Sequence, residues 1–157
     1  MIIEAFNQLQ RPLVVIGSGS QFTELQKKAQ SNIQLLGAQP NYMVEEYLAK
    51  AKAFVYAACE DFGIALVEAQ ASGTPVIAYG AGGAKETVKD IRKYPETGTG
   101  LLFSPQTPSA LVEAVERFES QRDRFISEQI YQQATRFSTQ QFHTAYLNFL
   151  EKSQTSS

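Results

Sequence analysis

Short apolar runs alternate with amphipathic segments along this chain. The first run, Leu13 to Ile16, ends at Gly17 and is short and apolar enough for a strand buried on both faces. Between such runs, apolar residues recur at intervals of three or four, which predicts helices. We expect strands at residues 13–16, 33–36, 53–58, 75–79 and 100–103, and helices at residues 1–9, 21–29, 42–51, 63–72, 85–90 and 108–118.

Residue types that begin helices mark several boundaries. Ser20, Asn41 and Thr107 precede predicted helices, and their side-chain oxygens can cap helix N-termini. Ser138 and Gln141 have the spacing of a capping box. Residues 119–137 are charged and helix-prone. The last helix is predicted to place four apolar residues on one face: Phe142, Tyr146, Phe149 and Leu150.

The alternation of strand and helix predicts the fold class. Repeated βαβ units imply an α/β fold, with a Rossmann-like parallel sheet and helices on both faces. No linker divides the sequence, so we expect one domain at residues 1–152 and a polar tail at 153–157. Ligands of such sheets bind beyond the carboxyl ends of the strands. The loops at residues 17–20, 37–41, 59–63 and 80–84 are therefore the candidate binding loops.

Composition excludes several classes of function. The 157 residues carry a net charge of −2, so no basic field for nucleic acid is expected. No apolar run approaches the ~20 residues of a membrane span, and no signal segment opens the sequence. The single cysteine, Cys59, cannot form an intrachain disulfide, and no metal-site spacing is present. These features predict a cytoplasmic domain without a metal.

Gly17-Ser18-Gly19 follows a strand and opens a helix, as in dinucleotide-binding sites. That fingerprint needs a third glycine three residues later, where Phe22 stands. It also needs an acidic residue at the end of the next strand, which ends in Leu36-Gly37-Ala38. We therefore reject a dinucleotide cofactor and interpret the glycines as a tight turn.

The segment from Glu60 to Gly73 is more specific. Glu60 falls on a candidate binding loop, and Glu68 falls about five residues into the following helix, roughly 7 Å along its axis. The helix start at Gly63 offers free backbone N–H groups and a dipole that favour a phosphate. Two carboxylates on either side of a phosphate site can hold the hydroxyls of two sugars. A nucleoside diphosphate sugar has this layout.

The alternative is that both glutamates are ordinary surface acids on an amphipathic helix. Ile64, Val67 and Ala71 are predicted to form the core face of this helix. Glu68 follows Val67 directly and so lies at the edge of that face. An acid in this position, near the carboxyl edge of a sheet, favours a binding role.

The segment resembles the Glu-x7-Glu motif of retaining glycosyltransferases with the GT-B fold, in the large family that includes mannosyltransferases and sucrose synthases. The resemblance covers about residues 2–118 and includes Phe-Gly-Ile at 62–64, Gly-Gly-Ala-Lys-Glu at 82–86 and Gly-Thr-Gly-Leu-Leu at 98–102. It implies hexosyl transfer from a nucleoside diphosphate sugar to a hydroxyl acceptor without a metal. Within this family, the sequence is most similar to mannosyltransferases of surface-polysaccharide assembly, which implies GDP-mannose as the donor.

The resemblance assigns a role to individual residues. Glu60 would be the catalytic-site carboxylate that contacts the donor sugar, and Glu68 would bind the ribose hydroxyls. Backbone groups of residues 62–64 would hold the diphosphate, and the strand end at 36–38 would face the base. The donor-binding residues implied in this way are Glu60, Phe62, Gly63, Ile64, Glu68, Leu36, Gly37, Ala38, Gly82 and Gly83.

Two parts of the family pattern have no match here. One is a first, central strand with a loop whose arginine and lysine neutralise the diphosphate; Arg11 and Lys27 do not stand at matching positions. The other is the acceptor-binding domain. We therefore expect the isolated chain to be inactive, and its exposed sheet edge to favour a homodimer. In the parent enzyme, peripheral membrane attachment is an open option. The rival interpretations are a nucleotide or sugar-phosphate binding module without turnover, and an interaction domain that has lost its ligand.

Overall fold

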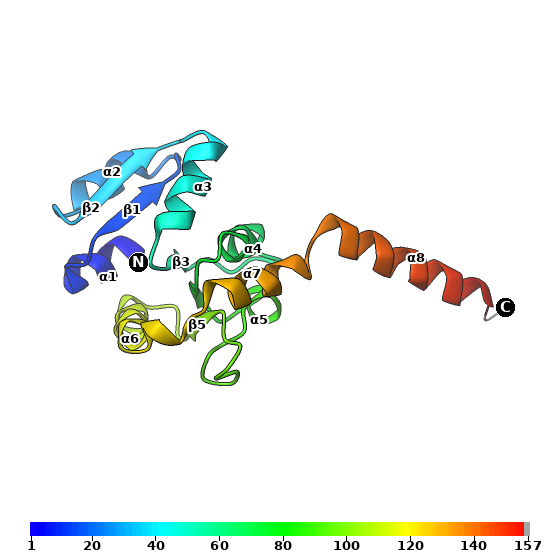
Figure 1. Ribbon diagram of the computed structural model, residues 1–157. Helices are drawn as coiled ribbons and strands as arrows, with labels where there is room; N and C mark the ends of the chain where they lie inside the picture. The colour runs from blue at the N-terminus through cyan, green and yellow to red at the C-terminus, as the bar shows by residue number, and fades with distance from the viewer. Residues whose placement is uncertain (156–157) are drawn as a thin grey trace.

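The computed structural model describes the backbone of residues 1–155 and the side chains of residues 1–151, and it forms an α/β fold (Figure 1). Strands and helices alternate from α1 to α6, as predicted. The strands are β1 (Leu13–Ile16), β2 (Ile33–Gly37), β3 (Phe54–Tyr56), β4 (Val76–Tyr79) and β5 (Gly100–Phe103). The helices are α1 (Ile2–Leu9), α2 (Phe22–Lys28), α3 (Asn41–Lys50), α4 (Ile64–Ala71), α5 (Ala84–Thr87), α6 (Pro108–Ser120), the 3₁₀ helix η1 (Arg122–Arg124), α7 (Ser127–Thr135) and α8 (Thr139–Thr155).

Every strand pair is parallel, which confirms the α/β class with helices flanking parallel sheets. The strands form two sheets instead of one continuous sheet. β1 pairs with β2, with Leu13 opposite Ile33. β4 lies between β3 and β5, with Val76 opposite both Phe54 and Gly100. No ladder joins β1 to β3 in the described part of the chain.

Alternate residues of β4 face two different helical layers. Ile77 belongs to the larger hydrophobic cluster, which contains Leu111 of α6 and Phe6 of α1. Val76 and Ala78 belong to a smaller cluster with Leu66 of α4. Because successive side chains of a strand point to opposite faces, α4 and α6 cover opposite faces of this sheet. The sheet of β3, β4 and β5 is therefore buried on both sides.

The sheet of β1 and β2 is less buried. Val14 keeps 38% of its surface exposed, so the prediction of a first strand buried on both faces is wrong. Neither α2 nor α3 contains a fully buried residue. The packing of this sheet comes mainly from α1, whose Ile3 and Phe6 lie in the larger cluster. The first part of the chain is thus an under-packed lobe.

Helix caps follow the predictions only in part. The Thr107 side chain accepts a hydrogen bond from the N–H of Ala110, with Pro108 at the first helical position, as predicted. The predicted caps at Ser20 and Asn41 are wrong, because each helix begins one residue away from where the cap would need to be. Gln21 precedes α2, and Asn41 is itself the first residue of α3.

The buried face of α4 also differs from the prediction. Leu66, Ala69 and Gln70 are buried, whereas Ile64 is 65% exposed. The buried face is the one that packs against β4 and α7, and not the one that apolar spacing alone predicted. Another difference follows β4, where α5 ends at Thr87 and not at residue 90.

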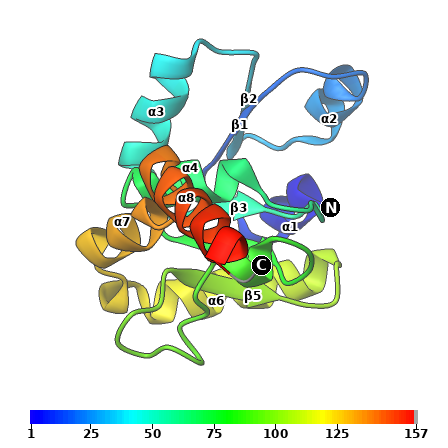
Figure 2. The ribbon, with the colours of Figure 1, turned by 90° about the vertical axis from the view of Figure 1, so that its right-hand side faces the viewer.

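The C-terminal helices behave differently from one another. α7 packs against α4, whereas α8 extends away from the rest of the molecule and is seen nearly end-on in Figure 2. Gln141 donates its backbone N–H to the Ser138 hydroxyl, which is one half of the predicted capping box. α8 continues to Thr155, past the predicted domain end; Ser156 and Ser157 lie outside the described residues. Its four predicted face residues are all exposed: Phe142, Tyr146, Phe149 and Leu150.

Candidate functional site

The candidate loops at the carboxyl ends of the strands meet in two pairs. The first pair joins the loop after β1 to the loop after β2. The N–H of Gly17 donates to the carbonyl of Gly37 at 2.8 Å, and the ring of Phe22 lies against Gly37. Gly17 and Gly37 both have positive φ, at 137° and 69°. Of the two glycines of the rejected dinucleotide motif, Gly17 thus has a backbone angle that favours glycine, whereas Gly19 has no positive φ.

The second pair joins the loop after β3 to the glycine-rich turn after β4. The N–H of Gly83 donates to the carbonyl of Glu60 at 2.8 Å. A Cβ on Gly82 would lie 2.2 Å from that carbonyl oxygen, and a Cβ on Gly83 would lie 2.3 Å from the carbonyl oxygen of Phe62. Only glycine fits at such distances. Gly82 and Gly83 thus hold the backbone of the Glu60 loop in place.

The start of α4 carries unpaired backbone donors. Gly63 has a φ of 79°, and its carbonyl accepts from Leu66 at 3.0 Å, so it closes the first turn. No side chain caps this helix, and no acidic residue stands in its first turn. Within residues 1–155, the N–H groups of Ile64 and Ala65 have no hydrogen-bond acceptor. A helix start of this kind is suited to an anion, because its donors and its dipole both favour negative charge.

Both motif glutamates are exposed to solvent and lie on either side of this helix start. Glu60 precedes α4 by four residues, and Glu68 lies on the exposed side of its middle turn. Across the described residues, the Glu68 carboxylate makes neither an ion pair nor a hydrogen bond. Two carboxylates that face solvent are available for ligand hydroxyl groups.

A tyrosine missed by the sequence analysis lies beside Glu60. Tyr56 is the last residue of β3 and packs against Phe54, with 6.0 Å between ring centroids. Burial, and secondly the hydrogen-bonding and charge of the Glu60 carboxylate, raise the pKa of Tyr56 to about 12. The phenol is therefore a neutral donor facing Glu60 at physiological pH. Its position at a strand end was the available signal in the sequence.

An aromatic contact connects the candidate site to the C-terminal helices. The ring of Phe62 meets the ring of Phe137 edge to face, with centroids 5.7 Å apart. Phe137 lies between α7 and α8, 75 residues away in sequence from the loop that it supports. Phe62 is 45% exposed. Among the described residues, the Phe137 ring is the aromatic neighbour that packs against it.

The loop after β2 is partly occupied by its own contacts. Leu36 and Gly37 are half-buried and Ala38 is exposed. The side-chain amide of Gln39 donates to the carbonyl of Leu36 at 2.7 Å. This hydrogen bond fixes the strand end that the sequence analysis assigned to the base.

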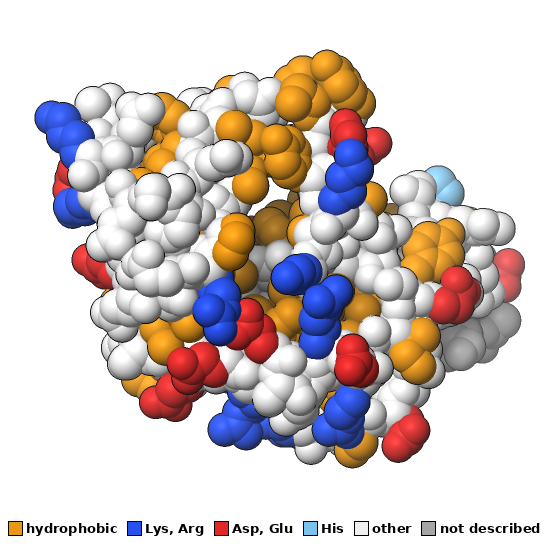
Figure 3. Space-filling view, turned by 60° about the vertical axis from the view of Figure 1, so that its left-hand side comes forward, with side chains coloured by type: hydrophobic (Ala, Val, Ile, Leu, Met, Phe, Trp, Pro, Cys, Tyr) orange, Lys and Arg blue, Asp and Glu red, His pale blue; other side chains and the backbone are white. Residues whose placement is uncertain are grey.

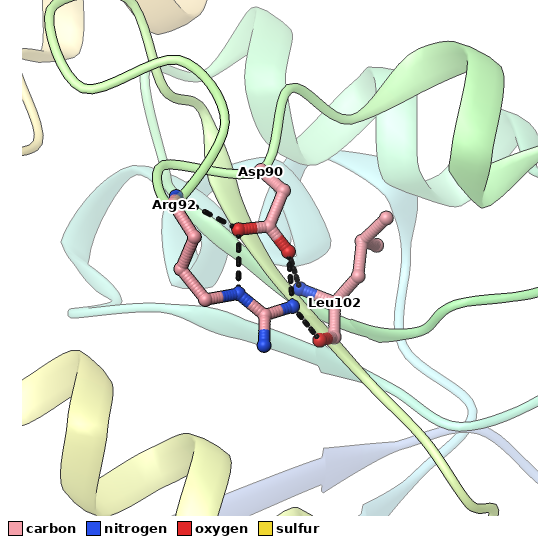
Figure 4. A network of polar contacts seen from close by, with 3 residues as sticks. All are labelled: Asp90, Arg92 and Leu102. Carbon is pink, nitrogen blue, oxygen red and sulfur yellow. Dashed lines mark hydrogen bonds and ion pairs between the residues drawn. The ribbon is translucent and has the colours of Figure 1, made fainter.

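An ion pair absent from the sequence analysis anchors the segment after α5 (Figure 4). Asp90 is buried; it accepts from Arg92 Nε at 2.9 Å and from the N–H of Leu102 at 3.0 Å. Burial alone would raise the pKa of Asp90, but these donors and the Arg92 charge outweigh it and hold the pKa below its usual value. The contacts tie this segment to β5. The sequence had predicted a helix through Asp90. These contacts explain why the helix ends before that residue.

Two partly open pockets lie away from the binding loops. One, of about 180 Å³, is lined at the amino ends of β3 and β4 by residues that include Lys52, Pro75 and Arg122. Another, of about 80 Å³, lies between β5 and α6. None of the predicted site residues lines either pocket. Residues 1–155 contain no group of three His, Cys, Asp or Glu side chains placed to hold a metal, and no helix able to cross a membrane.

Known proteins match this chain at the level of sequence. The model of the family "Glycosyl transferases group 1" matches residues 1–137. A glycogen synthase from Vibrio atlanticus is 30% identical over 122 residues, which is 74% of this chain and 25% of the relative. A D-inositol 3-phosphate glycosyltransferase from Corynebacterium urealyticum is 36% identical over 101 residues, which is 63% of this chain and 22% of the relative. The chain thus spans about a quarter of the length of these relatives.

Solved structures share the fold. Sucrose-phosphate synthase from Thermosynechococcus elongatus has a TM-score of 0.71 at 22% identity, over 98% of this chain and 49% of its own. HepE from Anabaena, in complex with UDP-glucose, has a TM-score of 0.76 at 23% identity, over 96% of this chain and 44% of its own. Since the family model covers residues 1–137 and the fold agrees, this chain belongs to the group 1 glycosyltransferases, which have the GT-B fold.

Proposed function

We propose that this chain is the donor-binding half of a retaining glycosyltransferase. It would bind a nucleoside diphosphate hexose at the loops after β3 and β4. The observation that carries this proposal is the start of α4, where unpaired N–H groups stand, along the chain, between two exposed glutamates. Family membership supports sugar transfer as the parent chemistry.

Each part of the donor has a proposed partner. The diphosphate would accept hydrogen bonds from the N–H groups at Gly63 and Ile64, where charge developing on the leaving group is stabilised best. The Glu60 carboxylate would accept from the hexose hydroxyls, and Glu68 from the ribose hydroxyls. The exposed Ala38 loop would contact the base. Gly82 and Gly83 would act by holding the Glu60 loop, and not by touching the donor.

The donor itself is a finer proposal. The resemblance of the sequence to mannosyltransferases favours GDP-mannose, whereas the structurally similar HepE was solved with UDP-glucose. Both donors present a diphosphate between a ribose and a hexose, so the same site chemistry serves either. We take GDP-mannose as the first donor to test and UDP-glucose as its competitor.

The isolated chain is proposed to bind without turnover. Transfer needs an acceptor hydroxyl held against the sugar carbon, and proximity of this kind supplies roughly 7–11 kcal/mol of a barrier. An open site also weakens each electrostatic contact, because water enters it. The other half of the enzyme would supply the acceptor site, and the proposed homodimer would not replace it.

Titration calorimetry of the 157-residue chain with GDP, GDP-mannose, UDP and UDP-glucose tests the proposal. We expect weak binding of the two ligands that share one base, either the guanine pair or the uracil pair. Within that pair, the intact nucleotide sugar should bind more tightly than the bare nucleotide. A radiolabelled-donor assay beside it should show no transfer to an acceptor. Absence of binding by all four ligands would favour an interaction domain, and robust transfer would show that the catalytic parts are complete.

A further inference from the structure

A pocket of about 180 Å³ lies at the amino ends of β3 and β4. The candidate donor loops follow the carboxyl ends of the same strands, so this pocket stands at the opposite edge of the sheet and has no part in the proposed function. One water molecule needs only ~10–15 Å³ of such space, so a small ligand has room to enter. We call it the amino-edge pocket; its polar lining residues are Lys52, Ser72, Thr74, Arg122 and Ser127.

Direct contacts fix the walls of the amino-edge pocket. The Thr74 hydroxyl donates to the carbonyl of Leu48 at 2.6 Å, which ties the segment after α4 to α3. Gly73 has a φ of 73°, and a Cβ on it would lie 3.1 Å from the Cβ of Ser127. The segment after α4 therefore lies directly against the start of α7. Because these contacts form the pocket in advance, binding of a ligand needs little reordering of the backbone.

Two positive side chains line the pocket without a negative partner. Lys52 precedes β3 and Arg122 begins η1, so two segments distant in sequence supply them. Within the described part of the chain, neither side chain makes an ion pair or a hydrogen bond, and no Asp or Glu lines the pocket. Lys and Arg side chains gather beside the hollow in the face that Figure 3 draws. Two like charges at one pocket repel each other, and an anion between them offsets that repulsion.

The ends of α3 and α4 offer an alternative explanation for these cations. Both helices end beside the pocket, and a cation near a helix C-terminus is favourable. Each such end carries about half a negative charge and the start of α7 about half a positive charge, so with Lys52 and Arg122 roughly 1.5 positive charges remain. The neighbouring acids Asp123 and Glu128 do not line the pocket, and Glu128 accepts from Gln132. The two cations therefore exceed what the helix ends require.

The start of α7 adds hydrogen-bond donors to the two cations. No side chain caps this helix, and the N–H groups of Ser127 and Glu128 have no acceptor within residues 1–155. The Ser127 hydroxyl has no hydrogen-bond partner among the described residues either. A phosphate group presents several oxygens to such donors, and a guanidinium can hold two of them at once. The lining of the pocket thus matches the oxygens of a phosphate group in both charge and donors.

We propose that the amino-edge pocket binds a phosphate group, with Arg122 and Lys52 as its cations and Ser127 as a neutral donor. Inorganic phosphate and a phosphomonoester present the same chemistry to these groups, and a titration with each distinguishes them. A carboxylate, with two oxygens in one plane, reaches fewer of the donors. The site goes beyond the proposed function, since it does not require that this chain bind a nucleotide sugar.

Two-dimensional NMR of the 157-residue chain tests the proposal, with inorganic phosphate and glycerol phosphate as probes at constant ionic strength in chloride. We expect saturable shifts of the backbone amide signals of Gly73 and Ser127, whereas acetate should give no saturable shift there. If both probes bind, the tighter one identifies the source of the phosphate group. A phosphate at the candidate donor site would instead move the signals of Ile64 and Ala65. The amino-edge pocket and the donor site are therefore measured separately, and either one can fail alone.

Three variants decide whether the two cations hold the ligand. Arg122→Gln and Lys52→Gln should each weaken phosphate binding by about tenfold, because each removes a charged hydrogen bond. Arg122→Lys keeps the charge but loses the fork of donors, so it should recover only part of the affinity. Lys27→Gln is the matched control, since it removes the same charge from an exposed lysine on α2 that lines neither pocket. It should leave the affinity within about twofold, because its charge is screened by salt.

All of these substitutions change exposed side chains, and circular dichroism should show that each variant folds like the parent chain. Saturable shifts at Gly73 and Ser127 that Arg122→Gln and Lys52→Gln weaken, and Lys27→Gln does not, would support the site. Shifts that rise without saturation, equal binding of acetate, or an equal loss in Lys27→Gln would overturn it.

Discussion

The N–H of Gly83 donates to the carbonyl of Glu60 at 2.8 Å, so the turn after β4 fixes the loop that carries the first motif glutamate. The contact is close enough that neither Gly82 nor Gly83 has room for a Cβ. Thr87 strengthens this arrangement, because its hydroxyl donates to the carbonyl of Gly83 at 2.9 Å. The position of Glu60 therefore depends on a segment more than 20 residues away in sequence.

Replacement of Gly83 by alanine should separate the two loops. The new Cβ would lie within 2.5 Å of three backbone atoms of Phe62, and backbone cannot move aside as a flexible side chain can. Overpacking of this kind costs about 1–3 kcal/mol, occasionally more. We expect a lower free energy of unfolding in urea and weaker binding of the nucleotide sugar.

Gly80→Ala is the matched control for that substitution. A Cβ at Gly80 would meet its nearest neighbours, Leu102 and Phe103, at 3.4 Å, which is ordinary contact. This variant should unfold at nearly the same urea concentration as the parent chain. If both alanine substitutions lowered the free energy of unfolding equally, the close contact between Gly83 and the Glu60 loop would not be the cause of the loss.

The two motif glutamates should be separable by ligand. Glu68→Gln is expected to weaken binding of the bare nucleotide and of the nucleotide sugar, because both contain the ribose. Glu60→Gln should spare the bare nucleotide and weaken only the nucleotide sugar. Loss of a charge-assisted hydrogen bond costs about 1.5–3 kcal/mol, or roughly tenfold to a hundredfold in affinity. Calorimetry on both variants gives the comparison, and equal losses for both ligands would contradict the assigned roles.

Asp90 should make the stability of the chain depend on pH. Its pKa is lowered in the folded state, so the stability that it contributes is present above the unfolded pKa of about 3.9. That contribution is lost as the pH falls through the lower folded pKa. We expect Asp90→Asn to cost about 1–3 kcal/mol at pH 7, since buried donors lose a charged acceptor.

The pH profile distinguishes this effect from simple packing damage. The difference in unfolding free energy between the parent chain and Asp90→Asn should shrink as the pH falls below about 4. Glu24→Gln removes an exposed ion pair with Lys28 and should change stability little at pH 7. A difference for Asp90→Asn that stays constant from pH 7 to pH 3 would rule out the linkage.

The order of the elements could be predicted from the sequence, because hydrophobic periodicity and glycine positions are local signals. The strands at residues 13–16 and 100–103 and the Thr107 cap are confirmed at residue level. The split between the two sheets could not be predicted, because it depends on which strands find neighbours in space. The buried face of α4 was missed for a similar reason. Which face of α4 is buried depends on its neighbours β4 and α7, and apolar spacing within one helix does not reveal them.

Long-range contacts at the candidate site were equally hidden in the sequence. Glu60, Phe62 and Gly63 stood out because the motif is continuous. Tyr56 and Phe137 did not, since one ends a strand and the other precedes a helix among many aromatic residues. Whether the predicted site residues bind a donor stays a prediction that the mutants above address.

Phe137 offers a test of the site at a position outside the motif. Its ring supports Phe62 edge to face, and such aromatic pairs contribute about 0.5–1.5 kcal/mol beyond their buried area. Phe137→Ala should loosen the loop between Glu60 and α4 and so misplace both the carboxylate and the helix N–H groups. We expect affinity for the nucleotide sugar to fall by about twofold to tenfold. Phe142→Ala is the control, because Phe142 is 66% exposed on α8 and lies against Tyr146 and not against the loop. Calorimetry on the two variants, with circular dichroism to compare their folding, measures the effect. If Phe142→Ala weakened the donor as much as Phe137→Ala, the aromatic contact would not be what holds the loop.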